Sequence, residues 1–229
     1  MNFGPSRLYP THRYLLKNGV SKLDRLLVLN GTIAWKDNRF KRVKLNLRHA
    51  LREQQQGRCI FCRRMITIER RNALEDIEHY LDKSKPHYKK WIFCPVNLTI
   101  ACRPCNFVKS TAELGDAAVV TANEYVATMG VFKWIHPYFD DYHQNIEILN
   151  GWVYRVRPAA PNPQAAKNMI RDLQLDNLAT MHAYATEVKG KILRLTELAS
   201  KAVQMNNLPR AQALLQASKV YQQQVWPDY

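Results

Sequence analysis

The sequence has no run of apolar residues long enough to cross a membrane, for which about eighteen are needed. Its first residues, MNFGPSRLYPTHRY, lack the continuous apolar segment of a secretory signal. It also has no internal repeat and no low-complexity tract. We therefore expect a cytoplasmic protein without a membrane partner. The 229 residues suffice for one substantial domain or two small ones.

Acidic residues are scarce, with 19 Asp and Glu against 34 Lys and Arg, for a net charge of +15. Residues 1–119 hold 23 basic and 10 acidic side chains, whereas residues 120–229 hold 11 and 9. A positive field attracts polyanions, and phosphate contacts supply most non-specific affinity for nucleic acids. The charge therefore favours a nucleic-acid partner, DNA or RNA. A solvated basic surface or attraction to anionic lipid is the alternative interpretation.

Cysteine is also infrequent, but four of the five residues form two Cys-x-x-Cys pairs. Cys59 and Cys62 make the first pair, and Cys102 and Cys105 make the second. Two such pairs supply the four thiolates of a tetrahedral zinc site, and a complete ligand set leaves no position for water. The predicted zinc is therefore structural and should stabilise the fold. Cys94 is expected to be a small core residue and not a ligand.

Polar residues suited to hydrolysis lie between and just after the cysteine pairs. His79 can act as a general base near neutral pH. Glu78 beside it, and the side-chain carbonyl of Asn106, can bind Mg²⁺ through oxygen. Asn97 can hold the loop opposite His79, and Lys109 can contact a phosphate. An ordinary structural role is the alternative for each residue taken alone.

These residues resemble a known family. The segments EHYLDKS and NLTIACRPCNFVKS, together with both cysteine pairs, resemble the zinc-knuckle subclass of HNH endonucleases in the ββα-metal family. The resemblance implies that His79 activates water, that Glu78 and Asn106 bind one catalytic Mg²⁺ or Mn²⁺, and that Asn97 braces the loop bearing His79. Asp82 stands where many members have proline, which leaves the geometry of this loop open.

The resemblance also implies an α+β fold. Its centre would be a ββα-metal HNH core with structural zinc, flanked by helices and followed by a C-terminal antiparallel helical region. LRHALREQQQGRCIFC, IEHYLDKSKP, HPYFDDY and LQLDNLATMH are similar to HNH proteins encoded beside an ATPase in Septu-type and retron-linked anti-phage systems. This second likeness implies an effector nuclease whose C-terminal helices dock on an ATPase partner.

We therefore predict an endonuclease that hydrolyses phosphodiester bonds, with DNA favoured over RNA. Two alternatives stay open. The first is a zinc-stabilised nucleic-acid-binding module without catalysis, which has no need of Glu78, His79 and Asn106 together. The second is a nuclease that acts on structured RNA such as tRNA only when it is activated in a complex.

Hydrophobic spacing and turn residues divide the chain into four predicted regions. These are a basic N-terminal arm or lead-in (1–45), the zinc-stabilised nuclease core (46–115), a connecting region with a β-hairpin (116–162) and a C-terminal helical region (163–229). In the core and the connecting region we expect helices at 45–56, 103–114 and 117–128, strands at 65–68, 73–81 and 98–101, and a hairpin turning at Asn150-Gly151. Two or three antiparallel helices should follow from residue 165 onward.

Overall fold

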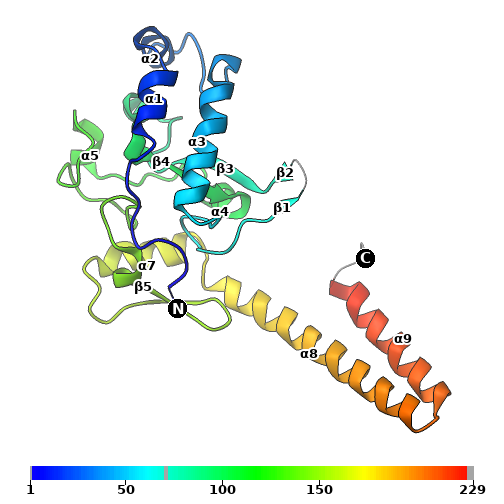
Figure 1. The fold of residues 1–229 in the computed structure, drawn as a ribbon. Helices are drawn as coiled ribbons and strands as arrows, with labels where there is room; N and C mark the ends of the chain where they lie inside the picture. Colours follow the sequence, from blue (N-terminus) through cyan, green and yellow to red (C-terminus); the bar gives the residue numbers. More distant parts are fainter. Residues whose placement is uncertain (1, 70–71, 226–229) are drawn as a thin grey trace. The chain divides into compact units, whose positions relative to one another are not determined.

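A computed structural model describes residues 2–69 and 72–225 (Figure 1). The chain divides into two compact units, which are described separately. The first unit comprises Met1–Leu149 with Tyr154–Leu175, and the second comprises Asn150–Val153 with Asp176–Tyr229. Helices and small antiparallel sheets make this an α+β protein, as the sequence predicted. Within the described residues no helix is both long and apolar enough to span a membrane.

The first 45 residues contain two short helices, a 3-10 turn and the start of a third helix, although the sequence predicted only an arm or lead-in. Ser21 starts the second helix through a reciprocal capping box with Asp24. A Cβ on Gly19 would lie 2.8 Å from the side chain of Val43, so glycine permits the first helix to approach the third closely. The elements are α1 (Arg13–Gly19), α2 (Lys22–Leu29), η1 (Asn38–Phe40) and α3 (Lys41–Gln54).

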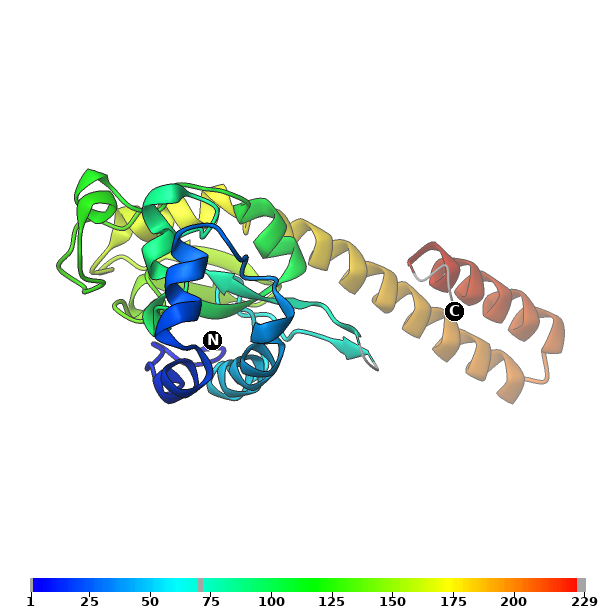
Figure 2. The same cartoon turned by 90° about the horizontal axis from the view of Figure 1, so that it is seen from above.

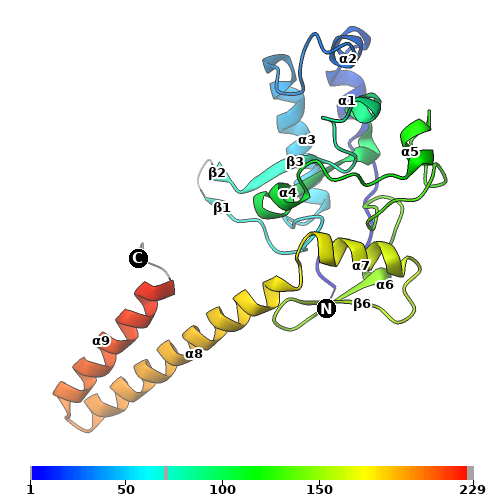
Figure 3. The ribbon, with the colours of Figure 1, turned by 180° about the vertical axis from the view of Figure 1, so that it is seen from behind.

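A two-stranded antiparallel sheet lies at the centre of the first unit, with a helix on each face (Figure 3). Glu75 on one face pairs with Arg52 of α3, whereas Asp76 on the other face bonds to Asn106 of α4. The predicted strand, loop, strand and helix are therefore present, although the helix predicted to reach residue 114 ends at Lys109. The elements are β3 (Glu75–His79), η2 (Pro86–Trp91), η3 (Pro95–Asn97), β4 (Leu98–Cys102) and α4 (Arg103–Lys109), preceded by the small pair β1 (Ile68–Glu69) and β2 (Asn72–Ala73).

The predicted hairpin pairs Ile146–Leu149 with Val153–Val156, and its turn falls among the residues assigned to the second unit. The turn falls at Asn150-Gly151, where Gly151 has a φ of +76° that glycine adopts easily. The helix predicted at 117–128 stops at residue 121, because Tyr125 turns inward and its hydroxyl bonds to His136. The elements are α5 (Ala117–Thr121), α6 (Tyr142–Asn145), β5 (Ile146–Leu149), β6 (Val153–Val156) and α7 (Pro163–Asp172).

Apart from Asn150–Val153, the second unit is an antiparallel pair of helices, α8 (Asn177–Gln204) and α9 (Leu208–Val225), which run side by side in Figures 1 and 2. This confirms the predicted helical pairing. The side chain of Asn207 accepts a hydrogen bond from the backbone N–H of Arg210 at 3.2 Å and so begins α9. Small residues are buried in this unit, including Ala199, Ala202 and Ala211.

Candidate functional site

Four cysteine side chains meet in the first unit. The sulfur atoms of Cys59, Cys62, Cys102 and Cys105 all lie within 4.8 Å of one another. Sγ of Cys62 is 3.9 Å from Sγ of Cys102, close to the distance of about 3.8 Å between sulfurs on one tetrahedral zinc ion. None of these cysteines forms a disulfide. The cluster can therefore hold a zinc ion, as the cysteine spacing predicted.

Each cysteine pair is held by a tight local structure. The N–H of Cys59 donates to the carbonyl of Arg64, and the N–H of Arg63 donates to the carbonyl of Cys59, both at 3.0 Å. Arg63 has a φ of +60°, which closes this turn. Cys102 ends β4 and precedes α4, whose first turn supplies Cys105. Local backbone geometry thus brings together the two cysteines of each Cys-x-x-Cys segment. The packing of β4 against neighbouring segments of the chain brings the two segments to one cluster.

A buried arginine lies beside the cysteine cluster. Arg63 is 2% exposed, its guanidinium lies 4.0 Å from the ring centroid of Tyr142, and its Nε and Nη1 atoms have no hydrogen-bond partner among the described residues. Burial lowers the pKa of Arg63, and electrostatic interaction with Tyr142, Cys59 and Cys62 opposes this effect. A zinc ion with four thiolates carries about two negative charges. Such a centre would compensate the buried guanidinium, so Arg63 supports a metal at this cluster.

A second group of polar residues lies where β3 meets α4. Asp76 and Glu78 are two apart on the strand and therefore face the same side. Nδ2 of Asn106 donates to Oδ2 of Asp76 at 3.0 Å. Nζ of Lys109 lies 2.7 Å from Oε1 of Glu78 and donates to the backbone carbonyl of His79 at 3.0 Å. The structure thus gathers Glu78, Asn106 and Lys109 from the predicted set and adds Asp76.

Lys109 does not face solvent, although the sequence analysis assigned it to a phosphate contact. Its side chain is buried, and its ammonium group is directed at Glu78. Burial raises the pKa of Glu78, while the positive charge of Lys109 lowers it. The lysine therefore neutralises a carboxylate that would otherwise be buried alone.

The ring of His79 lies on the other face of β3 from Glu78, because adjacent side chains on a strand alternate. Its Nε2 is 3.1 Å from the carbonyl oxygen of Ile92. A carbonyl only accepts, so Nε2 carries the proton and Nδ1 keeps its lone pair. Nδ1 is buried without a partner in the described chain, and the ring of Trp35 meets the imidazole edge-on with centroids 4.8 Å apart. Burial lowers the pKa of His79 well below its usual range, and the charge of Lys83 lowers it further, so the base form predominates.

Asn97 joins three segments around His79. Its Oδ1 accepts the N–H of Leu81 at 2.7 Å, and its Nδ2 donates to the carbonyls of Leu81 and Trp91 at 3.1 and 3.2 Å. The hydroxyl of Tyr125 donates to the same Oδ1 at 3.3 Å and lies 3.0 Å from Nε2 of His136. Asn97 therefore fixes the loop after β3 against η2. Its part in any reaction stays a prediction.

The structure also defines the positions of Asp82 and Cys94. The carboxylate of Asp82 accepts hydrogen bonds from the N–H and hydroxyl of Ser84 at 2.9 and 2.6 Å. These bonds fix the loop that follows β3. Cys94 lies outside the four-cysteine cluster and is half-buried, and burial raises the pKa of its thiol to about 11.

Sequence reasoning missed three residues at this site. Strand alternation could have indicated Asp76, because it shares a face with Glu78. Lys83 lies close enough to both Glu78 and His79 for its charge to lower their pKa values. Trp35 lies far from His79 in the sequence, and no local pattern places the two rings together.

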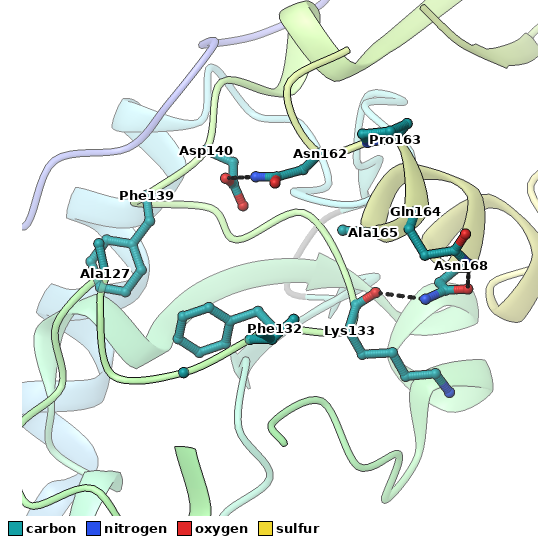
Figure 4. A pocket seen from close by; sticks show the side chains of 12 residues that line it. Ala127, Phe132, Lys133, Phe139, Asp140, Asn162, Pro163, Gln164, Ala165 and Asn168 are labelled. Carbon is teal, nitrogen blue, oxygen red and sulfur yellow. Dashed lines mark hydrogen bonds between the residues drawn. The ribbon is translucent and has the colours of Figure 1, made fainter. Parts of the chain in front are cut away.

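Figure 4 shows a separate pocket of about 410 Å³ in the first unit, formed in part by Phe132, Asp140 and Asn168. Its polar groups are used within the protein. Nδ2 of Asn168 donates to the carbonyl of Lys133 at 3.2 Å, and Oδ2 of Asp140 accepts the N–H of His136 at 2.7 Å. None of the predicted site residues lines this pocket. We therefore centre the candidate site on β3, β4 and α4.

No family model, curated protein or solved structure matches the chain.

Proposed function

We propose that this protein is an HNH-type endonuclease that hydrolyses phosphodiester bonds with Mg²⁺ or Mn²⁺, favouring DNA over RNA. One observation carries the proposal. β3 and α4 place Asp76, Glu78 and Asn106 on one face of the strand, and the next residue of β3, His79, carries an imidazole that is held as a neutral base on the other face. The four-cysteine cluster at the end of β4 and the basic charge of residues 1–119 support it.

The residues at β3 and α4 fit a hard divalent cation. Glu78, Asn106 and, in addition, Asp76 would hold it, because all three offer oxygen ligands on one face. Among the described residues, Oδ1 of Asp76 and Oδ1 of Asn106 accept no hydrogen bond. When bound, the ion would stabilise negative charge on the phosphate and on the leaving 3′ oxygen. Lys109 would stay paired with Glu78 and orient that carboxylate.

The proposed role of His79 follows from its hydrogen bond. The carbonyl of Ile92 holds the protonated Nε2 in place, so Nδ1 would accept the proton of the attacking water. The water oxygen would then form a bond to phosphorus as the bond to the 3′ oxygen breaks. Asn97 would keep the surrounding loop in position through Leu81 and Trp91.

A nuclease that acts only within a complex is the second candidate. The observation that favours it is the burial of His79, which is 1% exposed and covered in part by Trp35. A substrate would reach Nδ1 only after a local movement. The second unit is the proposed docking element for an ATPase partner, because it exposes the apolar residues Leu193, Val203, Leu208 and Leu215. The target of such a complex would be DNA or a structured RNA such as tRNA.

The nuclease proposal is tested by incubating the purified chain with Mg²⁺ or Mn²⁺ and plasmid, single-stranded DNA or total RNA. His79→Ala should abolish cleavage and leave zinc content and folding unchanged. His49→Ala, at an exposed histidine of α3, is the matched control and should cleave like the parent chain.

Cleavage that persists in His79→Ala would contradict the mechanism. A chain that binds nucleic acid but never cleaves it, alone or with its partner, would favour the binding module. Cleavage that appears only when the partner is supplied would favour the second candidate.

A further inference from the structure

A hollow of about 360 Å³ opens beside His79, between the loop after α2 and the segment containing η2. Its volume lies in the range of ligand sites, about 300–1,000 Å³. Its lining combines apolar side chains with amines and includes no aspartate or glutamate. The residues that matter for binding are Ile33, Trp35, Ile92, Lys36, Lys83 and Lys89.

The three lysines reach the hollow from three separate segments. Lys36 lies after α2, Lys83 lies after β3, and Lys89 is on η2. None of them forms a salt bridge within the described residues. Like charges gathered in this way repel one another until an anion neutralises them. The turn closed by Asp82 and Ser84 fixes the backbone on both sides of Lys83, a residue that lines the hollow.

The hollow is continuous with the surroundings of His79. Trp35 lines it and also contacts the imidazole edge-on. Ile92 lines it, and the carbonyl of the same residue pairs with Nε2 of His79. The charge of Lys83 acts on both His79 and Glu78. A ligand in the hollow would therefore lie next to the proposed reacting groups.

We propose that this hollow holds one unpaired nucleotide of the nucleic-acid substrate, next to the bond that is cut. The base would pack on Trp35 and its apolar neighbours, and the adjoining phosphates would pair with Lys83, Lys89 and Lys36. A base inside a duplex cannot enter without leaving its stack, which costs free energy. The inference rests on the proposed nuclease function and names the form of its substrate: a single strand or an unpaired site.

The lysines are tested by binding of the full chain to labelled oligonucleotides of about 12 residues, measured by fluorescence anisotropy over a range of salt without divalent cations. DNA single strand, RNA single strand and DNA duplex are the three probes. Lys83→Gln and Lys89→Gln should each weaken single-strand binding and reduce the salt slope by about 0.7. Lys22→Gln is the matched control, because Lys22 is exposed on α2 and outside the hollow.

The aromatic contact is tested with Trp35→Leu, which keeps an apolar side chain but removes the flat ring. Binding of a normal single strand should weaken about tenfold or more, the size of one lost base–aromatic stack, with an unchanged salt slope. Binding of an abasic strand of the same length should not change. Circular dichroism and zinc content show that each variant has folded.

Several results would overturn the inference. One is a Trp35→Leu chain that loses affinity equally for normal and abasic strands. Another is that Lys83→Gln and Lys89→Gln bind single strands with the same affinity and salt slope as Lys22→Gln. A third is that the parent chain and every variant bind the duplex as tightly as the single strand. Comparison of the affinities for the DNA and RNA single strands shows whether the hollow prefers a deoxyribonucleotide or a ribonucleotide. If the chain binds the probes as described but never cleaves nucleic acid, the nuclease proposal is wrong and the nucleotide-binding role of the hollow stands. If the chain cleaves but the lysine and Trp35 variants bind like the parent, the nuclease proposal stands and the role of the hollow is wrong.

Discussion

At the scale of single residues, the candidate site contains charges that are buried in pairs. Glu78 and Lys109 form one such pair, and their separation is 2.7 Å. On the opposite face of β3, buried Glu75 pairs with Arg52, which is only half-buried. A buried pair contributes little net stability, but removal of one partner leaves an uncompensated charge. The position of Glu78 therefore depends on Lys109, a neighbour to which no step of the proposed reaction is assigned.

Lys109→Met tests this dependence. The change should lower the free energy of unfolding by about 3–5 kcal/mol, because the carboxylate of Glu78 stays buried without its partner. Urea unfolding at neutral pH measures the loss. The double variant Lys109→Met with Glu78→Gln should recover most of it. A single variant as stable as the parent chain would show that the pair is solvated in solution.

Asp76→Asn tests the residue that the sequence did not indicate. Affinity for Mn²⁺ should fall about 10- to 100-fold, whether Asp76 binds the ion or orients Asn106. Titration calorimetry with Mn²⁺ gives this value without any need for cleavage. Glu53→Gln, at an exposed position of α3, should bind the ion like the parent chain. Equal affinity in the Asp76 and Glu53 variants would remove Asp76 from the site.

At the scale of elements, the four cysteines connect the turn at residues 59–62 to the junction of β4 and α4. This junction positions the helix that carries Asn106 and Lys109. The sequence predicted the cysteine pairs, the strands β3 and β4, and the hairpin, because spacing and alternation are local signals. Of the strand expected at 65–68, only Ile68 belongs to a strand, β1. It did not predict the inward direction of Lys109, the contact of Trp35 with His79 or the early end of α5. These features depend on packing between segments that lie far apart in the sequence, and no local sequence pattern predicts such packing.

Cys102→Ser tests the connection between strand and helix. The parent chain should contain about one zinc ion, and the variant should lose it together with several kcal/mol of stability. Elemental analysis and thermal unfolding measure the two effects. Cys94→Ser should keep its zinc, because Cys94 lies outside the cluster. A parent chain purified without zinc under reducing, chelator-free conditions would contradict the assignment.

The segment that carries Tyr125 and His136 predicts a dependence of stability on pH. Burial lowers the pKa of His136 well below its ordinary value, so the folded chain keeps it neutral. Below about pH 6.5 the unfolded chain takes up a proton that the folded chain does not, and stability falls. The contribution of this one group between pH 7.5 and 5.5 is about 1.4 kcal/mol.

Urea unfolding of the parent chain and His136→Gln at both pH values measures this contribution. The variant should lose less stability on acidification than the parent. His49→Gln should behave like the parent, because its imidazole is exposed in both states. Identical pH dependence in all three chains would show that His136 is protonated in the folded protein.

At the scale of the whole molecule, the chain contains two compact units with different contents. The first holds the cysteine cluster, the proposed catalytic residues and the lysine-lined hollow. The second is a pair of helices with exposed apolar side chains. The sequence indicated this contrast through the uneven distribution of basic charge and the long helical pattern near the C-terminus.

Ala202→Glu tests whether the units fold separately. Ala202 is buried in α8, so a carboxylate there should destabilise the helix pair. Limited proteolysis should cut residues 176–225 faster, while zinc content and the thermal unfolding of the first unit stay as in the parent chain. Gln204→Glu, near the end of the same helix and exposed, is the control. Loss of zinc in the Ala202 variant would show that the units are coupled.

The adjacency of Cys105 and Asn106 has a consequence for how long such a protein stays active in a cell. Cys105 of the cysteine cluster is followed directly by Asn106, whose side-chain amide donates to Asp76. Peroxide attacks thiolates and converts them to disulfides or sulfenic acids. Oxidative damage at the cluster would therefore displace the first turn of α4 and disrupt the proposed active site, with no attack on Glu78 or His79. Thiol repair and a supply of zinc would determine its working lifetime.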